Sequence, residues 1–500
     1  METFPKNVKP DEKANIAAYI YGNRFHADQT LYEYLIEFLL VFCGEKNSEK
    51  MCFHDPNATD RLEYTIEPRI GLKRFIFFDR NLSDNIADID VKAYHAHFEV
   101  LKTKINGVDD AKKVEFLEAV QDLFHGYAVV LKKRTWCAQA MLPICPELVF
   151  CEAMPRKKER VKLKWENRDD CNEKEKIDNC FDFDKRNFLA RGGEVYYLHI
   201  LQGLRRSKEL QAQLEKLLQY LLVKRGSKMS KLAVFIQKAW EDEMQYESPL
   251  TKKMYLSYIP ENAYIDIADR AVDELINFLS SEMHQIKTLE ILGKGIMLQV
   301  MRMISEATSK YLDVDRDYWI IDMKGERGDL VKKEAARSLK KQESSLEEAF
   351  GNKASELNKY SDVKERIKGL KEAKKDIWGI FKSKGKEMRC IIPARGAWER
   401  FSLDEDVIRF LVLAMVKPGD SMPFDKFLGK LYSHYNFVIG PVEYHAMSLD
   451  NNKNNGNLAS YFEDNKCAFQ LYLKATGFLR ELSDATSLVI NPYKKVELGE

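Results

Sequence analysis

LDEDVIRFLVLAMVKPGDSMPFDKFLGKLYSHY, residues 403–435, carries the clearest folding pattern in the chain. Its first half places apolar residues on one helical face, and the acids at 404–406 suit the positive end of a helix dipole. Pro418 and Gly419 end this helix, and a second helix begins near Pro423, a residue that fits a first helical turn. The stretch therefore predicts two successive helices joined by a tight turn.

A third helix and a strand pair are predicted in the segment that follows. Residues 458–475 have a helical pattern that turns Phe469, Tyr472 and Leu473 inward, and a helix broken near Asp464 and Asn465 is the alternative. The polar residues that recur every fourth position on the expected outer side are Lys466, Gln470 and Lys474. After Gly477, two runs rich in strand-forming residues flank a short polar turn, which indicates a hairpin.

Three helices followed by a hairpin, closed by YLKATGFLRELSDATSLVINPY at residues 472–493, resemble the winged-helix superfamily. The resemblance implies that the third helix enters the major groove of DNA and that basic residues of the wing approach the backbone. On this chain the matching positions are Lys466, Gln470, Lys474 and Arg480. Glu463 and Asp464 on the same helix depart from a basic recognition surface, and many winged helices bind proteins, so protein binding is the alternative.

Basic residues also precede this region. Residues 390–398 read CIIPARGAW, which predicts a short strand, a proline turn and an exposed loop. Arg395 and Arg400 lie in and beside that loop. They are candidate DNA contacts, because phosphate contacts can supplement a weak recognition surface.

A second candidate site follows a short strand predicted at residues 318–321. This strand leads into Asp322 and, two residues later, Lys324. A strand ending in Asp-x-Lys with another acid nearby resembles the core of metal-dependent nucleases, in which carboxylates hold Mg²⁺ and the lysine positions water. Asp315 and Asp317 are candidate partner acids. The tripeptide is common, so a charged loop after an edge strand is the alternative interpretation.

Composition limits the classes of function. The 500 residues include 79 Lys and Arg against 78 Asp and Glu, so any nucleic-acid surface has to be a local patch. The nine cysteines show no zinc-ribbon spacing, and their odd number fits reduced thiols in the cytoplasm. The sequence has no apolar segment long enough to span a membrane. These features predict a soluble cytoplasmic protein without a resident metal or cofactor.

The predicted fold is mainly α (α+β) with several domains. Residues 1–205 are expected to form a mixed α/β domain in which RIGLKRFIFF, residues 69–78, is a buried strand. Residues 206–329 have helical periodicity, residues 330–386 predict a helical hairpin or coiled-coil arm, and residues 387–500 form the winged-helix-like domain.

The segments RTWCAQAMLPICPELVF at 134–150 and NFLARGGEVYYL at 187–198, with the final module, also resemble proteins of bacterial anti-phage defence islands. The predicted function is therefore a non-enzymatic subunit that engages DNA or a DNA-bound complex together with other protein subunits. The alternatives are a Mg²⁺-dependent nuclease centred on Asp322 and Lys324, and a structural adaptor that binds protein.

Overall fold

The protein is mainly helical, as the sequence predicts. The computed structural model describes residues 2–11, 14–23, 25–78, 88–132, 139–152, 191–244, 251–326, 329–450, 459–483 and 486–498. Helices make up 62% of the structure and the sheets are small, which confirms the α (α+β) class. No helix in these ranges is both long and apolar enough to cross a membrane.

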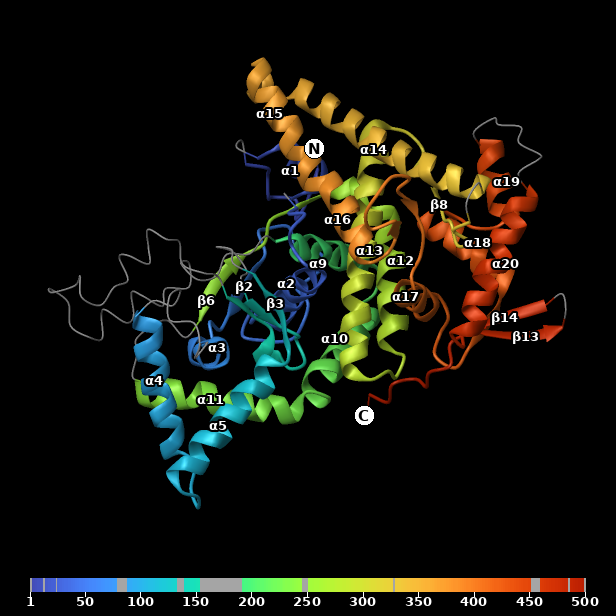
Figure 1. Ribbon diagram of the computed structural model, residues 1–500. Coiled ribbons are helices and arrows are strands. Elements are labelled where there is room, and N and C mark those ends of the chain that lie inside the picture. Colours follow the sequence, from blue (N-terminus) through green and yellow to red (C-terminus); the bar gives the residue numbers. More distant parts are fainter. Residues whose placement is uncertain are drawn as a thin grey trace.

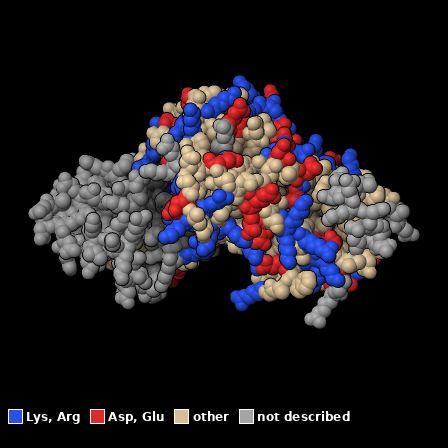
Figure 2. All heavy atoms as spheres, turned by 90° about the horizontal axis from the view of Figure 1, so that it is seen from above, with Lys and Arg blue, Asp and Glu red and all other residues tan. Residues whose placement is uncertain are grey.

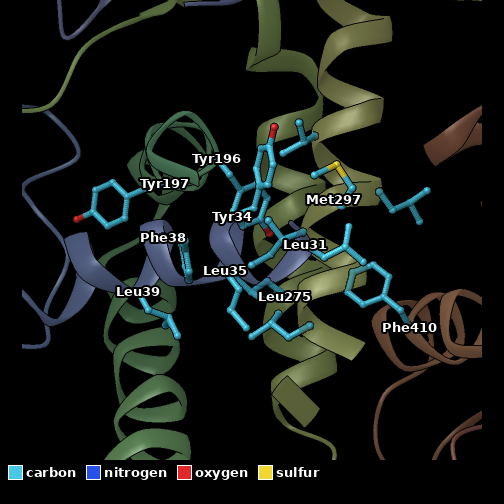
Figure 3. Close-up of a cluster of buried hydrophobic side chains, with 14 of the residues drawn as sticks. Leu31, Tyr34, Leu35, Phe38, Leu39, Tyr196, Tyr197, Leu275, Met297 and Phe410 are labelled. Carbon is cyan, nitrogen blue, oxygen red and sulfur yellow. The ribbon is translucent and has the colours of Figure 1, made fainter. Parts of the chain in front are cut away.

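Two long helices form the centre of the molecule (Figure 1). α12 (Glu261–Leu279) and α13 (Gln285–Leu312) pack against each other, and α2 (Leu31–Cys43), α9 (Gly192–Gly203) and α17 (Glu405–Met415) surround them. Side chains from all five helices meet in one core. Figure 3 shows Leu31, Tyr34, Leu35 and Phe38 of α2 with Tyr196, Leu275, Met297 and Phe410. The core therefore joins segments that are far apart in the sequence.

The amino-terminal elements include two strands that pair with strands from beyond residue 250. They are β1 (Thr3–Phe4), α1 (Ile16–Tyr21), β2 (Glu63–Ile66), α3 (Ile70–Phe77), α4 (Asp88–Thr103), α5 (Asp110–His125), β3 (Ala128–Leu131), β4 (Gln139–Met141) and β5 (Cys151–Glu152). β1 pairs with β7 (Ile259–Pro260), and β2 pairs with β6 (Lys252–Tyr255), both antiparallel. Strands β3, β4 and β5 form an antiparallel sheet of their own.

The expectation of a strand at residues 69–78 is wrong, because this segment forms helix α3. Leu72, Phe75 and Ile76 are fully buried on one helical face, at the i, i+3, i+4 spacing of an amphipathic helix. α3 packs against α11 (Ser227–Met244), where the backbone of Gly71 lies directly against Trp240. The apolar residues of this segment are thus buried by packing of α3 against α11, and not within a sheet.

Helices continue through the middle of the chain. α10 (Lys208–Gln219) leads by a π-helical turn (Tyr220–Lys224) to α11, and β8 (Trp319–Ile320) follows α13. The expected helical hairpin is present as α14 (Leu330–Glu356) and α15 (Val363–Ala373), which is followed by a π-helical turn (Lys374–Trp378) and α16 (Gly379–Glu387). The two helices of the hairpin form the upper edge of the molecule (Figure 1).

The carboxy-terminal elements alternate helices and short strands. After β9 (Ile391–Ile392) and β10 (Arg400–Phe401) come α17, β11 (Ser421–Pro423), α18 (Phe424–Tyr435), β12 (Phe437–Val438), α19 (Pro441–Asp450), α20 (Ala459–Ala475), β13 (Leu479–Ser483) and β14 (Thr486–Ile490). β11, β14 and β13 form an antiparallel sheet in that order, and β12 pairs in parallel with β8. Strand β11 and helix α19 are absent from the sequence prediction.

Candidate interaction site on the C-terminal module

Residues 403–493, which we call the C-terminal module, are fixed to the central helices through α17. The Asp404 side chain accepts a hydrogen bond from the backbone N–H of Val407 and caps the helix. Lys294 of α13 lies 3.2 Å from Asp404 and 2.7 Å from Asp406. Phe410 packs against Phe278 of α12. The acids that suit the helix dipole thus also attach the module to α13.

A buried polar network attaches α18 to the same two central helices. Glu274 of α12 accepts a hydrogen bond from the Tyr435 hydroxyl at 2.7 Å and forms an ion pair with Arg302 of α13 at 3.1 Å. His434 Nδ1 lies 2.9 Å from the same carboxylate. Burial opposes ionisation of Glu274, but the Arg302 charge and the His434 and Tyr435 hydrogen bonds outweigh it and lower the Glu274 pKa to about 2. The network therefore holds α18 against α12 and α13.

Asn465 and the buried apolar residues Phe462, Phe469 and Leu473 together fix which side of α20 faces outward. The Asn465 amide nitrogen donates to the carbonyls of Ile321 and Ile439, both at 2.9 Å, and its amide oxygen accepts from the backbone N–H of Met323 at 2.8 Å. The side chain is fully buried just beyond the carboxyl ends of β8 and β12. These three hydrogen bonds fix α20 against the parallel strand pair.

The three polar residues predicted on the outer row of α20 all bind neighbouring elements of the same chain. Lys466 is half-buried and lies 2.8 Å from Asp425 of α18. Gln470, also half-buried, donates a hydrogen bond to the Ser487 hydroxyl of β14. Lys474 is exposed and forms an ion pair with Glu481 of β13 at 2.6 Å. Lys466 and Gln470 thus lie at the border between α20 and its neighbours.

The side of α20 that faces solvent is less basic than the prediction implies. Its exposed residues include Glu463, Cys467, Leu471 and Lys474, which lie three or four positions apart. Leu471 is 65% exposed, and Leu482 on the adjoining strand β13 is 59% exposed. We call these exposed residues of α20 the α20 face. Its middle is formed by a thiol and an aliphatic side chain, and one acid and one base lie toward its ends.

The three arginines predicted to contact DNA have different environments. Arg400 is buried, and its Nε donates to the Asp322 carboxylate. Arg395, in the loop before β10, and Arg480, on β13, are both exposed. Only the latter two side chains are therefore accessible to a ligand.

The predicted nuclease residues are not gathered around one point. The Asp322 carboxylate accepts from the backbone N–H groups of Lys324 and Gly325, at 3.1 and 2.8 Å, in addition to Arg400. Lys324 lies 3.2 Å from both Glu326 and Asp464.

The two candidate partner acids have other environments. Asp317 is buried and pairs with Lys341 at 3.0 Å, whereas Asp315 is exposed. Across the described ranges, no group of three or more His, Cys, Asp or Glu residues is arranged to hold a metal ion. In a nuclease, a metal cation would balance the charge of Asp322. Here the Arg400 guanidinium balances it.

A separate hollow lies in the amino-terminal region. It has a volume of about 330 Å³, and its lining includes Leu40, Cys43, Ile66, Arg69 and Glu147. Burial raises the pKa of the Cys43 thiol to about 12, so the thiol stays protonated at neutral pH. The cysteine in this hollow is therefore not an activated nucleophile.

No family model, curated protein or solved structure matches this chain. The winged-helix resemblance and the association with anti-phage defence stay predictions from sequence. The anchoring residues Glu274, Arg302 and Asn465 have no sequence signal of their own, since each is a polar residue in an otherwise ordinary helical pattern. The α20 face has a weak signal, because Cys467 and Leu471 interrupt the polar side of a predicted amphipathic helix.

Proposed function

We propose that the protein is a non-catalytic subunit that docks through its C-terminal module onto a protein component of a nucleic-acid-associated complex. The observation that carries this proposal is the composition of the α20 face. A helix that reads DNA presents polar and basic side chains to base edges and phosphates. The middle of this face is instead Cys467 and Leu471, and exposed aliphatic side chains bordered by charges are typical of protein contacts.

The strand order of the module supports a winged-helix assignment, whereas α19 is a helix more than the predicted three and makes α20 the fourth. β11 lies between the first two helices and joins the terminal hairpin in the strand order β11, β14, β13, with α20 directly before the hairpin. α20 and the hairpin lie at the right-hand edge of the molecule in Figure 1, away from the central helices. A partner can therefore reach the α20 face without displacing the core.

Direct DNA contact by the same module is a second candidate function. Arg480 on the hairpin favours it, because its side chain is exposed and no carboxylate of the described residues lies within ion-pair distance. Lys466 and Lys474 could also exchange their surface ion pairs for phosphates, since such pairs contribute only about 0–1 kcal/mol.

Site-specific photo-crosslinking distinguishes the two candidates. Cys467 is replaced by p-benzoylphenylalanine in the full chain, and the protein is irradiated in an extract of its native host. Protein docking predicts one discrete adduct that resists nuclease and is lost when Leu471→Asp is added, because the new charge would have to be desolvated in the contact. The same crosslinker at exposed Lys231 of α11 is the control and should not form this adduct.

An adduct that disappears on nuclease treatment would overturn protein docking and support DNA contact. The charge reversals Lys474→Glu and Arg480→Glu would then reduce that adduct. Formation of the same protein adduct from position 231 would also contradict a specific role for the α20 face.

A further inference from the structure

The outer side of helix α15 and of the π-helical turn that follows it carries a row of four lysines. Lys364, Lys368, Lys371 and Lys375 are all exposed and follow one another at intervals of four, three and four residues. This spacing places them on one face of a helix. Together with Ile367 and Glu372 they surround a single open depression on the surface. We call these four residues the α15 lysine row.

These lysines have almost no internal charge partners. Among the described residues, no carboxylate lies within ion-pair distance of Lys364, Lys371 or Lys375, and Lys368 is 4.0 Å from Glu365. Lys374, which neighbours the row, behaves differently: it pairs with Glu343 at 3.0 Å and also with Glu347 of α14. The hairpin therefore neutralises a lysine that reaches α14, whereas three of the four lysines in the outer row lack an ion pair among the described residues.

The row is unfavourable for the helix by itself. Like charges three or four residues apart repel each other and destabilise a helix, whereas a Glu at any of these positions would form a stabilising pair. Figure 2 looks down on the molecule from above and shows positive and negative side chains interspersed over the described part of that face. The lysine row is thus a local feature and does not follow from an overall basic charge, since the chain has a formal net charge of +1.

The dimensions of the row suit a linear polyanion. Eleven residues separate the first and last lysine, which corresponds to about 16 Å along the helix axis. One strand of a nucleic acid carries a charge about every 3.4 Å, so the row spans about five phosphates. α15 lies in the hairpin at the upper edge of the molecule, where an extended strand can pass along it (Figure 1).

We infer that the α15 lysine row binds the phosphodiester backbone of a nucleic acid. The contacts are ionic, so binding is independent of base sequence. A membrane surface fits less well, because only Val363 and Ile367, which are 69% and 48% exposed, accompany the lysines and no aromatic residue does. This site is separate from the α20 face, so the two proposals stand or fall independently.

Fluorescence anisotropy of the full chain with labelled single-stranded and duplex oligonucleotides, across a salt series, tests the inference. The variant K364Q/K368Q/K371Q removes three charges from the row. The matched control K228Q/K231Q/K238Q removes three exposed lysines from α11, at the opposite end of the molecule (Figure 1). Circular dichroism confirms that both variants keep the helical content of the parent.

The row variant should bind about tenfold or more weakly at about 0.1 M salt, and the salt slope should fall by about 2 for a single strand or about 2.7 for a duplex. The control should stay within about twofold of the parent, and Leu471→Asp should bind like the parent. Equal losses in the row variant and the control, or absence of binding at low salt, would overturn the inference.

Two competitors define the ligand class. Poly-glutamate that displaces the oligonucleotide at equal charge concentration would indicate an acidic protein as the ligand and would contradict the inference. Vesicles containing phosphatidylserine that compete equally well would indicate a membrane surface and would contradict it as well.

Discussion

The ion pair between Asp322 and Arg400 decides how the most enzyme-like motif of the sequence should be interpreted. Both side chains are buried, and the carboxylate also accepts two backbone N–H groups. We expect Asp322→Ala to lower the free energy of unfolding by about 3–5 kcal/mol, because it leaves the Arg400 charge buried without a partner. The double variant D322A/R400M should lose less than the single variant, since it removes the unpaired charge. Urea unfolding of the three proteins measures both effects.

A catalytic role for Asp322 makes the opposite prediction. Removing a metal ligand from a nuclease would abolish Mg²⁺-dependent cleavage and leave the stability nearly unchanged. An Asp322→Ala variant with parental stability would therefore contradict the structural role of the ion pair.

Glu37 should give the protein a pH-dependent stability. Its carboxylate accepts the backbone N–H groups of Arg191 and Gly193, both at 2.8 Å, at the start of α9. Burial raises the Glu37 pKa from 4.5 to about 8 despite these hydrogen bonds. Between those two pH values the folded protein keeps a proton that the unfolded chain releases, so this group lowers stability as pH rises, by at most about 1.4 kcal/mol per pH unit.

The variant Glu37→Gln isolates that contribution. Buried histidines act in the opposite direction, since burial lowers the His199 pKa to about 3 and favours the folded state as pH rises toward 6.5. The measured quantity is therefore the difference in free energy of unfolding between parent and variant at pH 5, 6, 7 and 8. We expect this difference to change steadily in favour of the variant, and a constant difference would contradict a raised pKa.

At the scale of secondary-structure elements, the sequence predicts a helix correctly where an apolar stripe is bounded by residues that are typical of helix starts and ends. α17 and α18 are found where the apolar stripes, the acids at 404–406 and Pro418 place them. α3 was missed because Phe75 to Phe78 form a continuous apolar run, which fits a buried strand and a buried helix equally well. The segment forms a helix because it packs against Trp240, a residue far away in the sequence.

In the candidate site, too, contacts between residues far apart in the sequence determine what the local pattern does not predict. The periodicity of residues 458–475 predicts α20 and its buried residues Phe469 and Leu473 correctly. It does not predict that Asn465 is buried and donates hydrogen bonds to the carbonyls of Ile321 and Ile439, the residues that follow β8 and β12. Lys466 and Gln470 are consequently half-buried, and the middle of the exposed face belongs to Cys467 and Leu471.

At the scale of the whole molecule, strand pairs and helix contacts cross the boundaries that the sequence suggests. β2 pairs with β6 across the boundary at 205, and β8 pairs with β12 across those at 329 and 386. The sequence signals for a boundary are charge-rich segments and helix ends, which are local. Pairing partners are separated by more than a hundred residues, so local composition carries no information about them.

The C-terminal module should therefore not fold as an independent unit. In a fragment of residues 387–500, Phe410 would lose Phe278, β12 would lose β8, and Tyr435 would lose Glu274. Exposing these apolar and hydrogen-bonding groups removes the contacts that order the module, so we expect weak near-UV circular dichroism and no cooperative urea transition. A cooperative transition in the short fragment would instead establish the module as a separate domain that docks on the helices.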